Sequence, residues 1–285
     1  MPSTTEKNDL VYVPIEKWPT LEDLSVGFGE HLMPASSGLA GETVTIIFAG
    51  VMSITHHFAT ESSLNWEINS EPMKGVKGKH EYKAFEVRPG IFLVDFYKPE
   101  YEEQVTFAWK RSTGQIIAGI SKFTEVEGQR RTKTDFFQAH VATSPNAAHI
   151  PETEELVGRH IVYRYTPRDA YEHVYLNRGT LTWHCLFGTE KGLADTEYCR
   201  VFKVSDQLYL LFWTETVAPV ESIVIVDLQK MRTTGRFFCW DPKLKQLVRM
   251  NFGSYATQLA KTDAVAAALS PALLPQKNGS SENKA

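Results

Sequence analysis

The chain repeats itself at an offset of 117 residues, and this internal repeat constrains the fold more than any other feature. The stretches Met52–Ile68 and Asp169–Cys185 each carry a His at the same place, an aromatic residue two positions later and a Leu-x-Trp motif. The offset also matches the pairs Leu39/Leu156, Gly41/Gly158, Val44/Ile161, Phe48/Tyr165, Phe85/Phe202, Leu93/Leu210 and Phe96/Trp213. One register kept over so many apolar and aromatic positions indicates a tandem duplication.

Within each copy the segments are short, alternating and rich in Val, Ile, Thr and aromatic residues, which is typical of β-strands. The second copy reads "HIVYRYT", "YEHVYL", "TLTWHCLF", "EYCRVFKV", "LYLLFWTE" and "ESIVIVDL" between turn signals. A meander of about eight strands avoids exposed edges by closing into a barrel, whose interior holds one small ligand. The sequence therefore predicts an all-β fold: two tandem lipocalin-like antiparallel β-barrels related by an internal repeat, with short peripheral helices.

The predicted organisation has four parts. Residues 1–141 form an N-terminal barrel with a degenerate site, and residues 142–155, rich in Pro, Asn and Glu, form a linker. Residues 156–270 form a C-terminal barrel with the active site, and residues 271–285 form a disordered tail. A short helix is expected within Thr20–Leu32, where Thr20 and Asp23 resemble a capping box. The stretch Ala256–Ser270 has helical composition.

Composition restricts the classes of partner. A net charge of −4 and a pI near 6.2 provide no electrostatic footprint for nucleic acid or an anionic membrane. No apolar run reaches the roughly 18 residues of a membrane span, and "MPSTTEKNDL" lacks a signal-peptide pattern. The three cysteines predict reduced, buried thiols rather than a disulfide framework. We expect a cytoplasmic protein without metal or cofactor; a homodimer is compatible with the sequence.

The two copies differ at positions that face the barrel interior. Strand alternation places Tyr163 and Tyr165 on one face and Arg164 on the other, and the cation would be very costly inside a barrel. The tyrosines are therefore predicted to face inward, where the first copy has only the apolar side chains Ile46 and Phe48. Glu215 is in phase with the inward residues of its strand, and its counterpart is Lys98. The second barrel thus gains hydroxyls and a carboxylate, which predicts a reacting ligand there.

Each of these residues also has a structural interpretation. Tyrosines on barrel strands are often packing residues, and Glu215 could lie at a solvated rim. His56 and His173 recur in both copies, which by itself favours a structural hydrogen bond over catalysis. Trp66 and Trp183 recur in the same way and are expected to be core residues.

The second half resembles the MoaF family, which is named for its association with molybdenum-cofactor-linked operons. The similarity lies in "DAYEHVYLN", "TWHC" and "GTEKGLADTE", and the two-copy layout resembles the family from about Leu39 to Gly253.

A more distant resemblance is to phenolic acid decarboxylases, lipocalin-like barrels that need no cofactor. Their pattern of a Gly, a Tyr-x-Tyr strand, a Tyr-Glu strand, a Trp-Thr-Glu motif and an Arg-x-x-Gly before paired Phe falls on Gly158, Tyr163, Tyr165, Tyr171-Glu172, Trp213-Thr214-Glu215, Arg232, Gly235 and Phe237-Phe238. In that family the tyrosine pair, the motif Glu and a loop Arg bind substrate and transfer protons. Here the loop reads "GTEKGLADTE" and lacks the Arg, which argues against decarboxylation of a phenolic acid.

We therefore predict a cofactor-independent lyase or isomerase that acts by acid–base chemistry on a small, apolar, phenolic or conjugated molecule in the C-terminal barrel. The candidate catalytic residues are Glu215, Tyr163, Tyr165 and His173, and the candidate substrate-binding residues are Tyr171, Tyr175, Trp183, Trp213 and Arg232. The alternative is a non-catalytic small-molecule-binding or carrier protein of lipocalin type, linked to a molybdenum-cofactor or aromatic-amine operon. A third interpretation places a partner in the cleft between the barrels.

Overall fold

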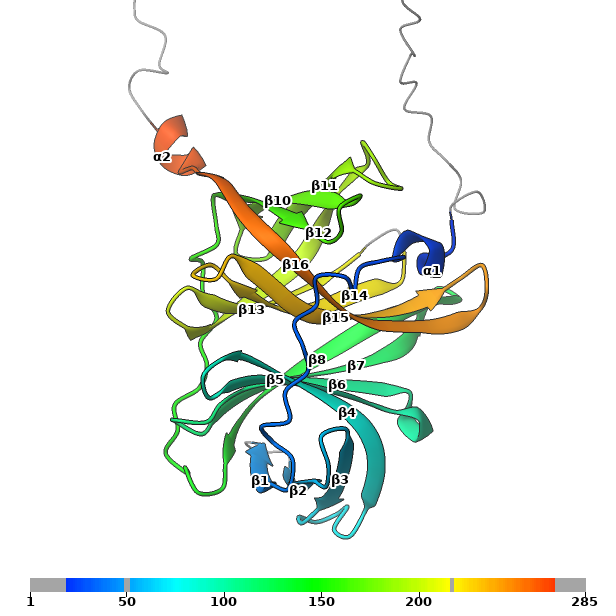
Figure 1. The fold of residues 1–285 in the computed structure, drawn as a ribbon, viewed down its shortest axis with the longest axis vertical. Coiled ribbons are helices and arrows are strands. Elements are labelled where there is room, and N and C mark those ends of the chain that lie inside the picture. The colour runs from blue at the N-terminus through cyan, green and yellow to red at the C-terminus, as the bar shows by residue number, and fades with distance from the viewer. Residues whose placement is uncertain (1–18, 49–51, 216–217, 270–285) are drawn as a thin grey trace, which may run out of the picture.

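Two closed eight-stranded antiparallel barrels follow one another along the chain (Figure 1). The computed structural model describes residues 19–48, 52–215 and 218–269, so the predicted tail at 271–285 lies outside the described residues. The prediction of two tandem all-β barrels is confirmed. β8 ends at Val141 and β9 begins at Arg159.

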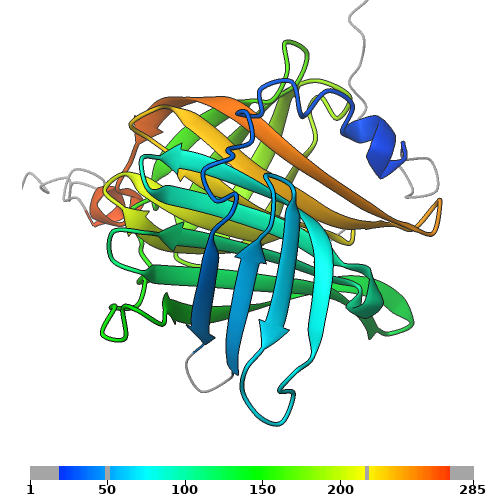
Figure 2. The same cartoon turned by 60° about the horizontal axis from the view of Figure 1, so that its bottom comes forward.

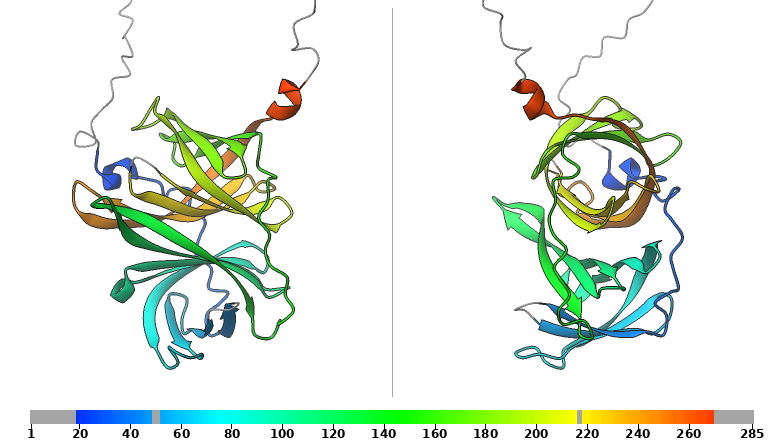
Figure 3. Two further views of the ribbon diagram at one scale, coloured as in Figure 1. Left: turned by 180° about the vertical axis from the view of Figure 1, so that it is seen from behind. Right: turned by 90° about the vertical axis from the view of Figure 1, so that its left-hand side faces the viewer.

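The N-terminal barrel consists of β1 (Thr43–Phe48), β2 (Met52–Phe58), β3 (Ser63–Ile68), β4 (Lys77–Arg88), β5 (Ile91–Lys98), β6 (Glu103–Lys110), β7 (Gln115–Val126) and β8 (Gln129–Val141). A 3₁₀ turn, η2 (Pro99–Tyr101), connects β5 to β6. The C-terminal barrel consists of β9 (Arg159–Arg164), β10 (Ala170–Asn177), β11 (Thr180–Phe187), β12 (Ala194–Ser205), β13 (Leu208–Thr214), β14 (Val220–Asp227), β15 (Arg232–Asp241) and β16 (Gln246–Lys261). Each strand pairs with the next, and β1–β8 and β9–β16 close the rings (Figure 3).

Strand alternation determines which side chains enter the C-terminal barrel. On β9, Ile161 and Tyr163 are buried in the interior, Arg164 is exposed, and Tyr165 just beyond the strand is again buried. On β13 the same alternation turns Tyr209, Leu211 and Trp213 inward. The two tyrosines therefore face inward, as the phase of the sequence predicts.

Two short helices lie at the ends of the described chain. α1 (Leu21–Leu24) follows the capping box of Thr20 and Asp23. α2 (Ala264–Ala268) is shorter than the helical composition of Ala256–Ser270 indicates, because β16 continues to Lys261. The helical prediction was wrong for residues 256–261, where pairing with β9 stabilises extended backbone more than local propensity stabilises a helix.

Residues 19–40, here called the N-terminal segment, cross between the two barrels. The prediction assigned them to the N-terminal barrel, yet Phe28 is buried in the core of the C-terminal barrel. Figure 1 shows α1, in dark blue, beside β14 and β16. Leu39, at the other end of the segment, belongs to the N-terminal core.

The barrels pack against each other through the outer faces of their strands (Figure 2). This interface is a third apolar cluster, to which β4, β5, β6 and β7 contribute from one barrel and β12, β13 and β14 from the other. The strands approach so closely that a Cβ on Gly119 would overlap the side chain of Ile223. Outward positions of these strands, such as Leu210 and Ile223, therefore carry buried apolar side chains.

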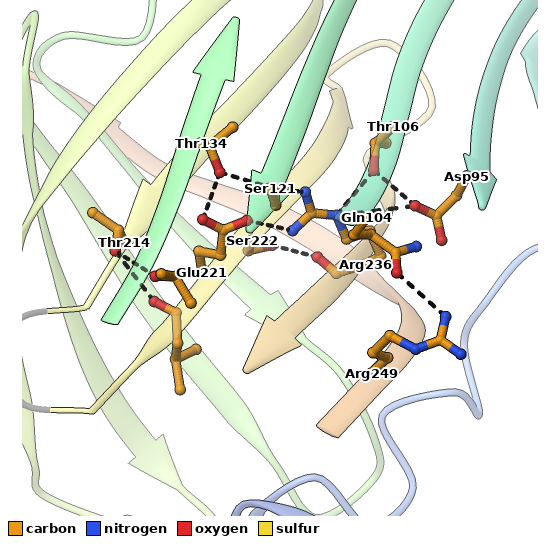
Figure 4. A network of polar contacts seen from close by, with 12 residues as sticks. Asp95, Gln104, Thr106, Ser121, Thr134, Thr214, Glu221, Ser222, Arg236 and Arg249 are labelled. Carbon is orange, nitrogen blue, oxygen red and sulfur yellow. Dashed lines mark hydrogen bonds and ion pairs between the residues drawn. The ribbon is translucent and has the colours of Figure 1, made fainter. Parts of the chain in front are cut away.

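A buried polar network crosses the same interface (Figure 4). Arg236 on β15 is 1% exposed and pairs with Glu221 at 3.0 Å (Nη1 to Oε1). Its Nε donates to the hydroxyl of Thr106, which in turn donates to Asp95. The charge of Arg236 is thus matched by carboxylates from both barrels.

The described residues contain neither a membrane-spanning helix nor a metal-binding cluster. No described helix has the length and apolar character needed to cross a membrane. Within the same residues, no group of three or more His, Cys, Asp or Glu side chains is arranged to hold a metal ion. The three cysteines are buried and form no disulfide.

Candidate active site in the C-terminal barrel

The C-terminal barrel encloses a cavity of about 70 Å³ at the end where β9 and β13 finish, here called the C-terminal cavity. Its lining combines aromatic rings with a small number of polar groups: Phe28, Tyr165, Tyr171, His173, Trp183, Glu190, Trp213, Glu215 and Phe237. Six of the nine predicted site residues lie on it, namely Glu215, Tyr165, His173, Tyr171, Trp183 and Trp213.

Glu215 follows β13 directly and places its carboxyl group on the C-terminal cavity. Burial raises its pKa to about 8, and repulsion from Glu190, Glu197 and Asp195 acts in the same direction. A hydrogen bond from the indole N–H of Trp213 opposes this shift. Glu215 is therefore mostly protonated near pH 7 and gives up its proton close to neutrality, as an acid–base catalyst should.

Two polar atoms in the lining lack hydrogen-bond partners among the described residues. They are Nδ1 of His173 and Nε1 of Trp183. His173 is 4% exposed, and burial lowers its pKa to about 3, so its imidazole is neutral at pH 7. Buried polar atoms are rarely left unpartnered, so these two mark positions where a ligand can accept or donate a hydrogen bond.

Tyr165 provides a phenol on the same cavity. Burial raises its pKa well above the usual range, and the neighbouring acidic groups of Tyr163 and Glu215 act in the same direction when they ionise. The hydroxyl therefore keeps its proton at neutral pH and can act as a hydrogen-bond donor beside the carboxyl group of Glu215.

Tyr171 and Glu190 form a second polar pair. The Tyr171 hydroxyl donates to Oε2 of Glu190 at 2.8 Å. Burial raises the pKa of Glu190, and the hydrogen bond from Tyr171 acts against this shift. Glu190 lies in the "GTEKGLADTE" loop, where the phenolic acid decarboxylases have their Arg. The loop thus contributes a carboxyl group in place of a cation.

Three predicted site residues do not lie on the C-terminal cavity. The hydroxyl groups of Tyr163 and Tyr175 bond to each other at 2.8 Å in the buried interior, so neither is directed at a ligand. The Tyr163 ring packs edge-on against His173 at 4.8 Å between centroids and thereby positions it. Arg232 lies on the outward face of β15, where Nη2 donates to the His31 carbonyl oxygen at 2.9 Å. Its assignment to substrate binding in the barrel is not supported by this position.

The sequence prediction missed three residues of the lining. Phe28 arrives from the N-terminal segment, and only its flanking glycines in "VGFGE" mark it. Glu190 lies in the "GTEKGLADTE" loop, whose sequence drew attention only by its lack of an Arg. Phe237 belongs to the paired phenylalanines of the decarboxylase pattern, and its inward phase on β15 identifies it.

Comparison with known proteins agrees with the two-barrel architecture. A model of the MoaF N-terminal domain matches residues 16–125, and a model of the MoaF C-terminal domain matches residues 150–262. Protein MoaF of Klebsiella aerogenes is 31% identical over 230 residues, which cover 75% of this chain and 84% of that protein. The chain belongs to the MoaF family.

Among solved structures, a putative β-lactamase from Burkholderia vietnamiensis is 13% identical and covers 39% of this chain and 100% of its own. Its TM-score is 0.29, a level at which the similarity carries no argument.

The MoaF N-terminal domain of this chain can be compared with the C-terminal one at the repeat-equivalent positions. His56, the counterpart of His173, is also buried, and burial lowers its pKa to about 4. At the position of Glu215 stands Lys98, whose ammonium lies 5.1 Å from the centroid of the Trp66 ring and pairs with Glu103 at 3.0 Å. The acid of the C-terminal domain is thus replaced by a cation that is already neutralised.

A larger groove of about 1020 Å³ lies between the two MoaF domains. Its polar side chains are largely engaged with one another: Asp95 accepts from Thr106 and Asn251, and Gln104 accepts from Arg249. The smaller C-terminal cavity is the stronger candidate site, because two of its buried polar atoms lack hydrogen-bond partners and burial raises a carboxyl pKa there to about 8.

Proposed function

We propose that the C-terminal barrel is a cofactor-independent lyase or isomerase in which Glu215 moves a proton on a small planar molecule, phenolic or conjugated. One observation carries the proposal: a carboxyl group with a pKa raised to about 8 shares an aromatic-lined cavity with an unpartnered imidazole nitrogen. Perturbed titration in a cavity with convergent polar groups is the physical signature of acid–base sites.

The ligand that fits this lining is neutral. Neither Lys nor Arg occurs among the described residues that line the cavity, whereas two carboxyl groups, Glu190 and Glu215, do. An anionic substrate would meet these groups without a counter-charge. Elimination, hydration or isomerisation of a conjugated molecule can proceed on a neutral substrate. Loss of carbon dioxide from a phenolic acid requires an anionic substrate and does not fit this lining.

Each polar group then has a defined task. Glu215 takes or gives the proton at carbon, and the Tyr165 hydroxyl donates to the substrate oxygen on which negative charge develops. A general acid–base group contributes about 10²–10⁴-fold to a rate, and one preorganised donor contributes about 10²–10³-fold. Neutral His173 provides a hydrogen bond that orients the substrate, and the faces of Trp183 and Trp213 enclose it.

The test measures proton exchange at carbon, so it does not require the reaction product to be known. A panel of neutral phenols and conjugated carbonyl compounds is incubated with the protein in D₂O, and deuterium incorporation at carbon is measured by NMR. We expect incorporation with the native protein at a rate that rises with pH around a midpoint near 8 when Glu215 acts as base. Glu215→Gln should reduce the rate by at least about 100-fold while the ligand still binds.

Lys98→Met is the matched control, because it changes the repeat-equivalent position in the other barrel. It should leave the exchange rate unchanged. Equal exchange by the native protein and Glu215→Gln would refute the catalytic role. Binding without exchange in any compound would favour the carrier alternative.

A further inference from the structure

The aromatic ring of Phe28 fills part of the C-terminal cavity from outside the barrel. Its ring stacks on Tyr165 with centroids 4.8 Å apart and planes inclined by 19°. Tyr171 meets it edge-on at 6.3 Å, and Phe237 meets it at 6.3 Å with a tilt of 41°. A stacked partner on one face and rings at the edges form a slot of the shape that a planar aromatic ring requires.

The N-terminal segment that carries Phe28 is held by individual contacts rather than by strand pairing. It takes no part in either sheet, and α1 buries none of its four residues. Its polar anchors on the C-terminal barrel include Leu21 N–H to Asp241 at 2.8 Å, Gly253 N–H to the Phe28 carbonyl at 3.3 Å, His31 Nδ1 with the Arg164 carbonyl at 3.0 Å, Arg232 Nη2 to the His31 carbonyl at 2.9 Å and the Glu30–Arg168 ion pair at 3.1 Å. Segments outside the paired strands open at lower free energy than the strands do.

The space that remains beside Phe28 is too small for a ligand. The cavity measures about 70 Å³, whereas an apolar cavity of about 150 Å³ binds benzene and ligand pockets span roughly 300–1,000 Å³. A substrate ring can therefore reach Glu215 and His173 only if Phe28 leaves.

We propose that Phe28 occupies the subsite for the aromatic ring of the ligand, and that the N-terminal segment must detach before a neutral single-ring aromatic molecule can bind. The inference rests on the proposed function for the identity of the site, and it adds the substrate class and a specificity-determining residue. While the N-terminal segment is attached, Phe28 prevents a ligand ring from entering the cavity. Once the segment has detached, the slot that Phe28 vacates favours planar rings.

Only molecules in which Phe28 has left the slot can bind the ligand. The apparent Kd therefore equals the intrinsic Kd divided by the fraction of such open molecules. If about a tenth or less are open, removal of the Phe28 ring should tighten binding by about tenfold or more. Loosening the segment without touching the slot should act in the same direction. Gly253 offers this route, because a Cβ there would lie 2.7 Å from both the His31 carbonyl oxygen and Leu32 Cα and would push the segment outward.

The experiment compares phenol with cyclohexanol by calorimetry and thermal shift, because the two share a hydroxyl and a six-membered ring but only phenol is planar. We expect Phe28→Ala and Gly253→Ala each to tighten phenol binding by at least about tenfold. Cyclohexanol should bind about two- to tenfold more weakly than phenol, since it cannot stack on Tyr165. A nonspecific cavity would accept both.

Two matched controls separate the slot from general loosening. Phe137→Ala removes a partly buried ring from the N-terminal core, and Gly179→Ala adds a methyl group where the nearest atoms lie 3.9 Å away. Neither should change phenol binding. Equal gains in the controls, or no gain in Phe28→Ala and Gly253→Ala, would overturn the inference.

Amide exchange in the native protein provides an independent readout that does not depend on any variant folding. If phenol displaces the segment, exchange of the Leu21 and Gly253 amides should accelerate as phenol is added. Slower or unchanged exchange at saturating phenol would overturn the inference. Catalysis is tested separately: Phe28→Ala combined with Glu215→Gln should keep the tight phenol binding, whether or not Glu215 carries proton transfer.

Discussion

At the scale of single residues, one position in each barrel distinguishes the two copies. Glu215 and Lys98 occupy the same place in the repeat, yet one is an acid with a pKa of about 8 and the other is paired with Glu103. The sequence predicts this difference because it follows from strand phase. It does not predict that Tyr163 bonds to Tyr175, because both phenols face inward and only packing decides which of them reaches the cavity.

Glu215 should also make stability depend on pH. Its folded-state pKa of about 8 exceeds the ordinary value of 4.5, so the native state binds more protons than the unfolded state between these values. The free energy of unfolding should therefore fall as pH rises from about 5 to about 8. Because Glu215 is partly exposed, we expect a loss of roughly 1–3 kcal/mol, less than the full shift implies.

Glu215→Gln should remove this component, since the amide does not titrate. Urea denaturation at pH 5 and pH 8.5 measures the difference for both proteins. The same loss of stability in the variant would show that other groups cause it.

At the scale of elements, the closure of each barrel begins at a repeat-equivalent glycine. Gly41 and Gly158 both have left-handed backbone, with φ of 81° and 79°. A Cβ on Gly41 would meet no atom within 4 Å, whereas one on Gly158 would overlap the carbonyl oxygen of Thr262 beyond β16. Glycine at position 41 is thus needed only for its left-handed backbone. At position 158 it is needed both for the left-handed backbone and for close contact with Thr262.

These glycines provide a matched pair of substitutions. Gly41→Ala should lower the free energy of unfolding by about 1 kcal/mol through backbone strain alone. Gly158→Ala should cost more, roughly 3 kcal/mol, because β16 must also shift away from β9. Chemical denaturation compares them directly, and equal effects would show that contact with Thr262 is unimportant.

At the scale of the whole molecule, the two barrels form one packed unit rather than two separate domains. Their outer strand faces share an apolar cluster, and the buried Arg236 pairs with Glu221 and contacts hydroxyls of the other barrel. Repeat proteins whose copies bury a common face depend on each other for stability. The N-terminal segment adds a further connection through Phe28.

The Arg236 network should behave as a coupled unit. Arg236→Met leaves Glu221 buried without its counter-charge and should destabilise the protein by about 3–5 kcal/mol. Adding Glu221→Gln to that variant should recover most of the loss, since the uncompensated charge is then removed. A thermal-denaturation double-mutant cycle measures the coupling, and additive losses would contradict it.

The sequence by itself determined the duplication, the all-β class and the inward phase of Tyr165, His173 and Glu215, because the repeat register and strand alternation are local properties that a chain carries in its order of residues. Only the tertiary structure decided that Phe28 enters the opposite barrel, that Glu190 joins the cavity and that Arg232 stays outside it. These outcomes depend on which surfaces fit when segments as far apart as His31 and Arg232 meet, and no local pattern encodes that fit.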